Sequence, residues 1–161
     1  MSSMILKAIQ SILKNLIRVG IVSSVDYRKG TAKVAFEDRD NLVSYDLDVL
    51  VKNSFRNKDY WLPDPEEQVL CLFLPIGNAQ GFILGSLYSL EDKLPIKNEN
   101  KRHVRFGDGT FIDYDRETHT LTIDFLHPEG GHIVINNATV KYNQTTQRGE
   151  PEWRSSEVLE T

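Results

Sequence analysis

The sequence is poor in cysteine, in clustered positive charge and in long apolar runs, and each shortage excludes a class of protein. The single cysteine, Cys71, excludes a disulfide within one chain and a metal site built from several thiolates of one chain. The 19 lysines and arginines are outnumbered by 23 acidic residues, and the net charge of −4 argues against a dedicated nucleic-acid-binding protein. No apolar run approaches the roughly 18–20 residues that a membrane-spanning helix needs. What remains is a mildly acidic chain of 161 residues, 40% hydrophobic, with enough apolar side chains for a modest core.

The sequence also lacks the common signatures of catalytic and nucleotide-binding sites. The patterns GxxxxGK[ST], GxGxxG, GxSxG and HExxH are all missing. Cys71 lies in an apolar run, where the pKa of a thiol rises and its reactivity falls. Asp113 and Asp115 share one strand face and could do acid–base chemistry, but they alternate with apolar residues outside any evident pocket. We interpret them as a solvated face and predict that the protein is not an enzyme; a small hydrolase using either aspartate is the weakest of three hypotheses.

Residues 1–17 are predicted to form an amphipathic helix. Apolar side chains recur there at steps of three and four, while Lys7 and Lys14 lie on the other side. Such a helix needs an apolar surface to lie on, which is either its own domain or a partner subunit. The residues assigned to docking on a partner are Ile5, Ile9, Leu13 and, near the C-terminus, Trp153.

Residues 18–88 are predicted to form one small β-domain. Five short strand-like segments follow one another with turns or loops between them, at 19–25, 31–36, 44–51, 69–74 and 81–85. The second and third alternate apolar and polar residues, and the fourth is a continuous apolar run, which is typical of a strand buried on both faces. This pattern, without a strong internal helix, fits a closed barrel of the OB-fold kind, with a small sandwich or an SH3-like barrel as the alternative. The segment between the third and fourth strands has no helical periodicity, which departs from the usual OB-fold plan.

The rest of the chain divides into three parts. Residues 89–102 are charged, contain Pro95 and lack periodicity, which predicts a linker. Residues 103–143 alternate apolar and polar side chains but hold too few large apolar residues to offset an ordering cost of roughly 1–2 kcal/mol per residue. They are therefore either loosely structured or fold against copies of themselves, and their threonine-rich alternation favours the second. Residues 144–161 are predicted to be a polar tail.

Three chains winding their strands about one axis would place each apolar stripe of residues 103–143 in a shared core. The residues assigned to this core are Ile112, Tyr114, Leu121, Ile123, Phe125, Ile133 and Ile135. The pattern alone does not determine the number of chains. His132 is the best candidate metal ligand, because one inward-pointing histidine from each of three chains would supply three ligands on the axis; otherwise it is a solvated turn histidine. No cofactor is predicted apart from such an axial metal ion.

Two short motifs and their order lead to a known family. The first is Gly-Phe-Ile-Leu-Gly-Ser-Leu-Tyr at 81–88, and the second is Asp-Gly…Tyr-Asp…Thr-Leu-Thr-Ile within 108–123. Trp-Leu-Pro at 61–63 and Glu-Gln-Val-Leu at 67–70 also match the family's approach to its fourth strand. With the preceding helix, this arrangement over residues 18–126 resembles the baseplate assembly protein V family, the central tail spike of contractile-tailed phages. It is similar in plan to the spike modules of R-type pyocins and to VgrG proteins.

The resemblance implies a mainly β fold in which an N-terminal helix and an OB-fold barrel precede an intertwined triple-stranded β-helix formed by a homotrimer. It implies a structural protein of a virion tail baseplate or phage-tail-like particle, assembled in the bacterial cytoplasm, that punctures or contacts the target-cell envelope. The implied partners are a baseplate hub protein and a PAAR-like tip protein, with no nucleic acid. The chain has neither the fused lysozyme domain nor the His-x-His iron apex of some relatives.

The alternative function is an OB-fold binding module for single-stranded nucleic acid or an oligosaccharide. Such a module needs aromatic side chains beside cations. Two clusters qualify, and acidic residues surround both: Tyr27 with Arg28 and Lys29, and Phe55 with Arg56 and Lys58.

Overall fold

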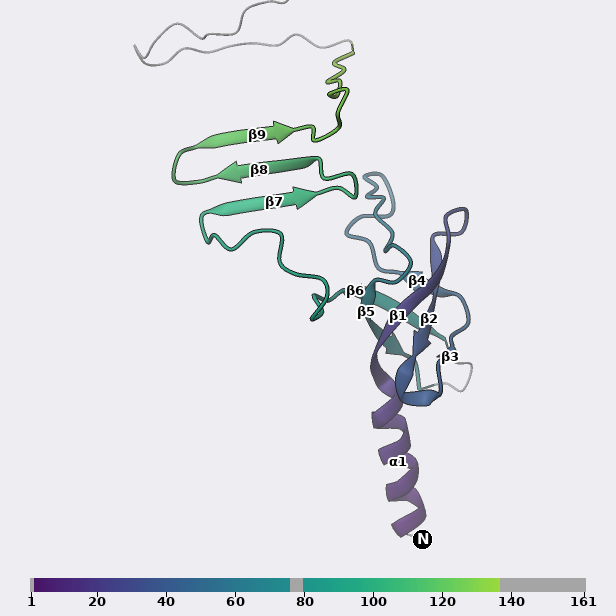
Figure 1. Ribbon diagram of the computed structural model, residues 1–161. Coiled ribbons are helices and arrows are strands. Elements are labelled where there is room, and N and C mark those ends of the chain that lie inside the picture. Colours follow the sequence, from purple (N-terminus) through teal and green to yellow (C-terminus); the bar gives the residue numbers. More distant parts are fainter. Residues whose placement is uncertain (1, 76–79, 137–161) are drawn as a thin grey trace, which may run out of the picture. The chain divides into compact units, whose positions relative to one another are not determined.

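The computed structural model describes residues 2–75 and 80–136 of the chain (Figure 1). The chain divides into two units, Met1–Asn98 and Glu99–Thr161, and each is considered by itself. No helix among the described residues is long and apolar enough to cross a membrane.

The first unit begins with helix α1 (Ser2–Leu16), which passes directly into the first strand. Figure 1 shows α1 projecting from the strands of this unit, with only its C-terminal end beside them. Lys14 lies in the last turn, where a positive charge interacts favourably with the helix dipole. The predicted N-terminal helix is therefore present, and most of its length extends beyond the strands.

Five strands of the first unit close into a barrel. β1 pairs with β2 and with β5, β5 pairs with β6, β6 runs parallel to β4, and β4 pairs with β2. The short β3 pairs with the end of β2. The strand bounds are β1 Ile17–Asp26, β2 Thr31–Phe36, β3 Leu42–Val43, β4 Leu47–Val49, β5 Gln68–Phe73 and β6 Gly81–Ser86. The predicted five-stranded barrel is thus confirmed, and closure protects its strand edges from pairing with other chains.

The barrel core is built from the inward-facing residues of these strands. It comprises Val22, Ala32, Val34, Phe36, Leu47, Val69, Cys71 and Ile83, all almost completely buried. Gly20 on β1 allows the facing strand to approach, because a Cβ atom there would lie 2.5 Å from Cγ1 of Val34 and 2.8 Å from Cδ1 of Phe36.

The connection between β4 and β5, residues 50–67, contains no helix, as its lack of periodicity indicated. Its far end is bound to the barrel by two backbone hydrogen bonds. The amide of Val22 donates to the carbonyl of Glu67, and the amide of Glu66 donates to the carbonyl of Val22. The connection is therefore a long loop held against the barrel, and it lacks the helix that an OB-fold usually has between these strands.

The second unit contains a three-stranded antiparallel sheet of β7 (Lys101–Arg105), β8 (Phe111–Asp115) and β9 (Thr120–Asp124). β7 begins two residues inside the segment that we predicted to be a linker, because Lys101 pairs in register with Asp115. Residues 125–136 continue without regular strands, and residues 137–143 lie outside the described residues. The intertwined trimeric β-helix therefore stays a prediction.

Candidate functional site

The main candidate site is one face of the sheet formed by β7, β8 and β9. Ile112 stands opposite Ile123 on one side and Val104 on the other, and Tyr114 stands opposite Leu121. Directly opposite residues of antiparallel strands point to the same side of the sheet, so these five side chains form two adjacent cross-strand rows. Arg102 stands opposite Tyr114 on β7, so the row of Tyr114 and Leu121 ends in a cation at the edge of the sheet. We call these five residues the apolar face. All are exposed, from 38% for Ile112 to 64% for Leu121.

The apolar face collects four of the seven predicted core residues. The fifth member, Val104, was missed because it stands alone between charged residues, and only its pairing with Ile112 reveals it. A three-stranded sheet is stable when its hydrophobic side is covered, and soluble chains rarely leave a contiguous apolar patch open. The apolar face can therefore bury hydrophobic surface against another molecule, which is how protein chains associate with one another.

The remaining predicted core residues follow the sheet in irregular chain. Phe125 is half-buried and packs directly on Gly131, where a Cβ atom would collide with the phenylalanine ring. Ile133 and Ile135 are exposed. The structure therefore does not include these three residues in the sheet.

The opposite side of the sheet holds a buried charge, which the sequence did not predict. Asp113 is only 4% exposed. Its Oδ2 accepts a hydrogen bond from Nζ of Lys101 at 2.7 Å, and its Oδ1 lies 3.2 Å from Nδ1 of His103. The Lys101 hydrogen bond is the largest cause that lowers the pKa of Asp113, and the same bond raises the pKa of Lys101. The imidazole of His103 is tilted against the ring of Phe111, with ring centroids 5.2 Å apart.

These contacts correct the interpretation of Asp113 as part of a solvated face, whereas Asp115 is partly exposed. Asp113 is the centre of a cross-strand ion cluster, and Asp115 closes the turn after β8. Oδ1 of Asp115 accepts hydrogen bonds from the backbone amides of Glu117 and Thr118, at 2.8 and 3.2 Å. The sequence holds one signal for this cluster: Lys101 and His103 are two residues apart, as are Asp113 and Asp115. The signal can be used only when the pairing of the two strands is known. Both carboxylates have structural roles in this geometry.

Helix α1 forms a second apolar surface. The predicted docking residues Ile5, Ile9 and Leu13 are 58%, 48% and 63% exposed, so the barrel of the same chain does not cover them. A groove of about 600 Å³ lies between the end of α1 and the barrel. Its lining includes Ile12 and Leu16 of the helix and Leu42, Val43 and Tyr45 of the barrel. The fourth predicted docking residue, Trp153, lies outside the described residues.

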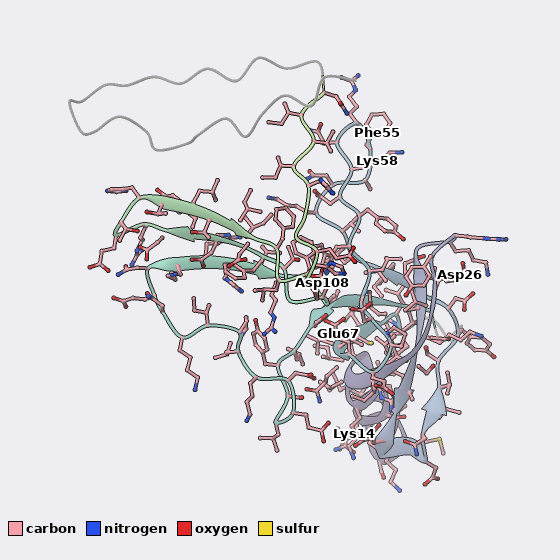
Figure 2. All side chains as sticks on the ribbon, turned by 45° about the horizontal axis from the view of Figure 1, so that its top comes forward. Lys14, Asp26, Phe55, Lys58, Glu67 and Asp108 are labelled. Atoms are coloured by element: carbon pink, nitrogen blue, oxygen red, sulfur yellow. The ribbon has the colours of Figure 1, made fainter. Side chains whose placement is uncertain are left out.

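The two clusters of aromatic and cationic residues that would bind nucleic acid or an oligosaccharide lie apart from each other in the first unit. Figure 2 shows Asp26 at the β1–β2 turn, well away from Phe55 and Lys58 on the loop between β4 and β5. Nζ of Lys29 lies 3.2 Å from Asp46 and 3.5 Å from Asp26, and the Asp46 hydrogen bond is the main cause that raises the pKa of Lys29. Two neighbouring carboxylates therefore pair with Lys29, one of the two cations of the first cluster, which weakens the cluster as a site for polyanions.

The remaining candidates for chemistry are His132 and Cys71. His132 is exposed in irregular chain. Within residues 2–75 and 80–136, one chain holds no group of three or more His, Cys, Asp or Glu side chains that could bind a metal ion. Cys71 is fully buried, and burial raises the pKa of its thiol to about 11, as its apolar surroundings in the sequence indicated.

The first unit is thus a closed barrel, and the second contains a β-sheet with an exposed apolar face. In comparison with known proteins, the chain is 32% identical over 111 residues to the spike protein of Escherichia phage P2. The match covers 69% of this chain and 51% of the phage protein, so the chain spans about half the length of this relative. No family model matches the sequence. The similarity supports a relationship with phage tail spike proteins and a structural role in a phage tail.

Proposed function

We propose that the protein is the central spike or baseplate assembly protein of a contractile phage tail or phage-tail-like injection system, and that it acts as a homotrimer. The observation that carries this proposal is the exposed apolar face of the β7–β8–β9 sheet. Similarity to the phage P2 spike protein supports the same conclusion independently.

Three copies can cover this face without any other component. If each sheet forms one side of a three-sided prism, the rows centred on Ile112 and Tyr114 meet at a common axis. The polar side, with Asp113 paired to Lys101 and His103, then faces outward. Fully burying a large apolar side chain contributes roughly 1.5–3 kcal/mol, so covering five half-exposed ones on each of three chains provides a substantial driving force. Interwound sheets of this kind would also resist axial load, because many backbone hydrogen bonds share it.

The proposed role gives each surface a partner. The barrel would form a collar that contacts a baseplate hub protein, and the C-terminal region would contact or puncture the target-cell envelope. A PAAR-like tip protein would cap the far end, and His132 from three chains could hold an axial metal ion. None of these steps requires catalysis, so we propose a non-enzymatic, structural protein.

The test is the mass of the full-length chain in dilute solution. At micromolar concentration, sedimentation velocity and light scattering are expected to give three times the 18.4 kDa mass of one chain. A monomer with a folded β7–β8–β9 sheet would overturn the proposal, because its apolar face would then be stable in water.

A further inference from the structure

Helix α1 has an apolar stripe that its own domain does not cover. Its principal contacts in this unit are with β1 and β5, at the end where the helix joins the barrel. Ile5, Ile9 and Leu13 remain about half exposed or more. A helix of 15 residues is about 22 Å long and close to the lower limit for an isolated helix in water. Its formation therefore depends on cover from another surface.

The apolar stripe follows a heptad repeat. Numbering the helix with Leu6 at position a places apolar residues at every a and d position from residue 6 onward. These seam residues are Leu6, Ile9, Leu13 and Leu16. The two g positions hold Ile5 and Ile12, which widens the stripe beyond a two-stranded seam.

The charges of the helix agree with packing against identical helices. Lys7 and Lys14 both fall at position b, on the outer side of a coiled coil, and no charged residue of α1 falls at e or g. Figure 2 shows Lys14 on the helix, beside the barrel. Identical helices in parallel would therefore meet without repulsion between like charges. An acidic partner helix packed on the apolar stripe could not form ion pairs with Lys7 and Lys14, because both lysines lie on the side of α1 away from the stripe.

We propose that α1 packs in parallel against the same helix of two other copies, forming a short three-stranded coiled coil. In a parallel arrangement each seam residue meets its own counterpart, so the repeat is complementary to itself. Leucine at a with isoleucine at d, the pair that Leu6 and Ile9 form in the first heptad, favours three or four strands over two. The second d position holds Leu16, and the widened stripe also favours more than two strands. The inference rests on the proposed homotrimer, because two heptads are too short to associate alone and need the high local concentration that a trimer provides.

Disulfide formation between introduced cysteines tests this packing in the full-length chain. Leu13→Cys places a thiol on the seam, and Lys14→Cys places one on the next residue, on the outer side. We expect Leu13→Cys to form a disulfide-linked pair of chains under mild oxidation at least about tenfold faster than Lys14→Cys, because only seam positions bring two Cα atoms within disulfide range. The wild-type chain controls for Cys71, whose thiol is buried. Antiparallel helices would separate the two copies of residue 13, so the assay also reports direction.

A second variant covers the case in which the cysteine alters the seam. Leu6→Glu with Leu13→Glu should reduce the helical signal in circular dichroism while the particle keeps the mass of three chains. The matched control, Lys7→Glu with Lys14→Glu, should keep the signal.

The outcomes separate this inference from the proposed function. A trimer with equal disulfide rates at positions 13 and 14, or with an unchanged helical signal in the double glutamate variant, would overturn the coiled coil and leave the trimer standing. A monomeric wild-type chain would overturn both. Faster linkage at position 13 within a particle of three chains supports both.

Discussion

Replacing Ile123 with lysine tests whether the apolar face is a shared interior. Ile123 stands opposite Ile112 in the register and is 42% exposed in one chain. Fully burying an isoleucine contributes roughly 1.5–3 kcal/mol, so covering its exposed part contributes roughly 1 kcal/mol per chain. Losing that contribution three times costs about 3 kcal/mol per trimer, which corresponds to about a 100-fold weaker association. Three ammonium groups brought close together in a partly dry interior add further repulsion and desolvation cost.

We therefore expect Ile123→Lys to sediment mainly as a monomer, or to aggregate, at concentrations where the wild type is a trimer. Ile123 is not part of the barrel, so the urea midpoint of the barrel, followed by tryptophan fluorescence, should not change. The control is Thr122→Lys, which places the same charge on the neighbouring, exposed residue of β9, opposite Asp113 on the polar side. It should remain a trimer. An Ile123→Lys trimer of wild-type stability would refute the reasoning, and dissociation of both variants would show that disturbance of β9, and not of the apolar face, is responsible.

Three further predictions concern the two units separately. Gly20→Ala should destabilise the barrel by about 1–3 kcal/mol in urea unfolding, because the added Cβ atom meets Val34 and Phe36. The control Gly107→Ala should have little effect, since no atom lies within 4 Å of its added Cβ atom. Equal urea midpoints for the two variants would contradict the close approach of the strands at Gly20. Asp113→Asn should destabilise the β7–β8–β9 sheet by leaving Lys101 and His103 without their carboxylate. Because the folded-state pKa of Asp113 is lowered, its stabilisation is complete above the unfolded pKa of about 4 and is lost as the pH falls through the folded value; acid unfolding that is identical in wild type and Asp113→Asn would rule this out. Cys71 should react with a thiol reagent at pH 7 only as fast as the barrel unfolds, since burial raises its pKa to about 11, and rapid labelling of the native protein would show that the thiol is accessible.

Much of the first unit could be predicted because its patterns are local. Period-two alternation, short apolar runs and the turns between them indicated the five strands of the barrel, and a 3.6-residue period indicated the helix. Val22, Val34, Leu47, Val69 and Ile83 are all apolar in strand patterns, and all are buried.

The ion cluster around Asp113 could not be predicted in the same way. Asp113 and Lys101 are separated by 11 residues, and their contact depends on the register between β7 and β8. Local polarity placed Lys101 in a linker and Asp113 in water, whereas strand pairing buries the carboxylate and supplies its partners. Val104 is an apolar example of the same dependence on strand pairing. Its neighbours in the sequence are charged, and only its pairing in a row with Ile112 and Ile123 places it on the apolar face.

The sequence alone determined the order of helix, barrel and β-rich segment, and it indicated that the third part has too few apolar residues to stand alone. Periodicity and composition carry this information because they depend on neighbours along the chain. The tertiary structure decided which side chains share a face, that one face of the β7–β8–β9 sheet is apolar and open, and that α1 extends beyond its barrel with its stripe exposed. These features arise from strand register and from packing between segments distant in the chain, which no local pattern records.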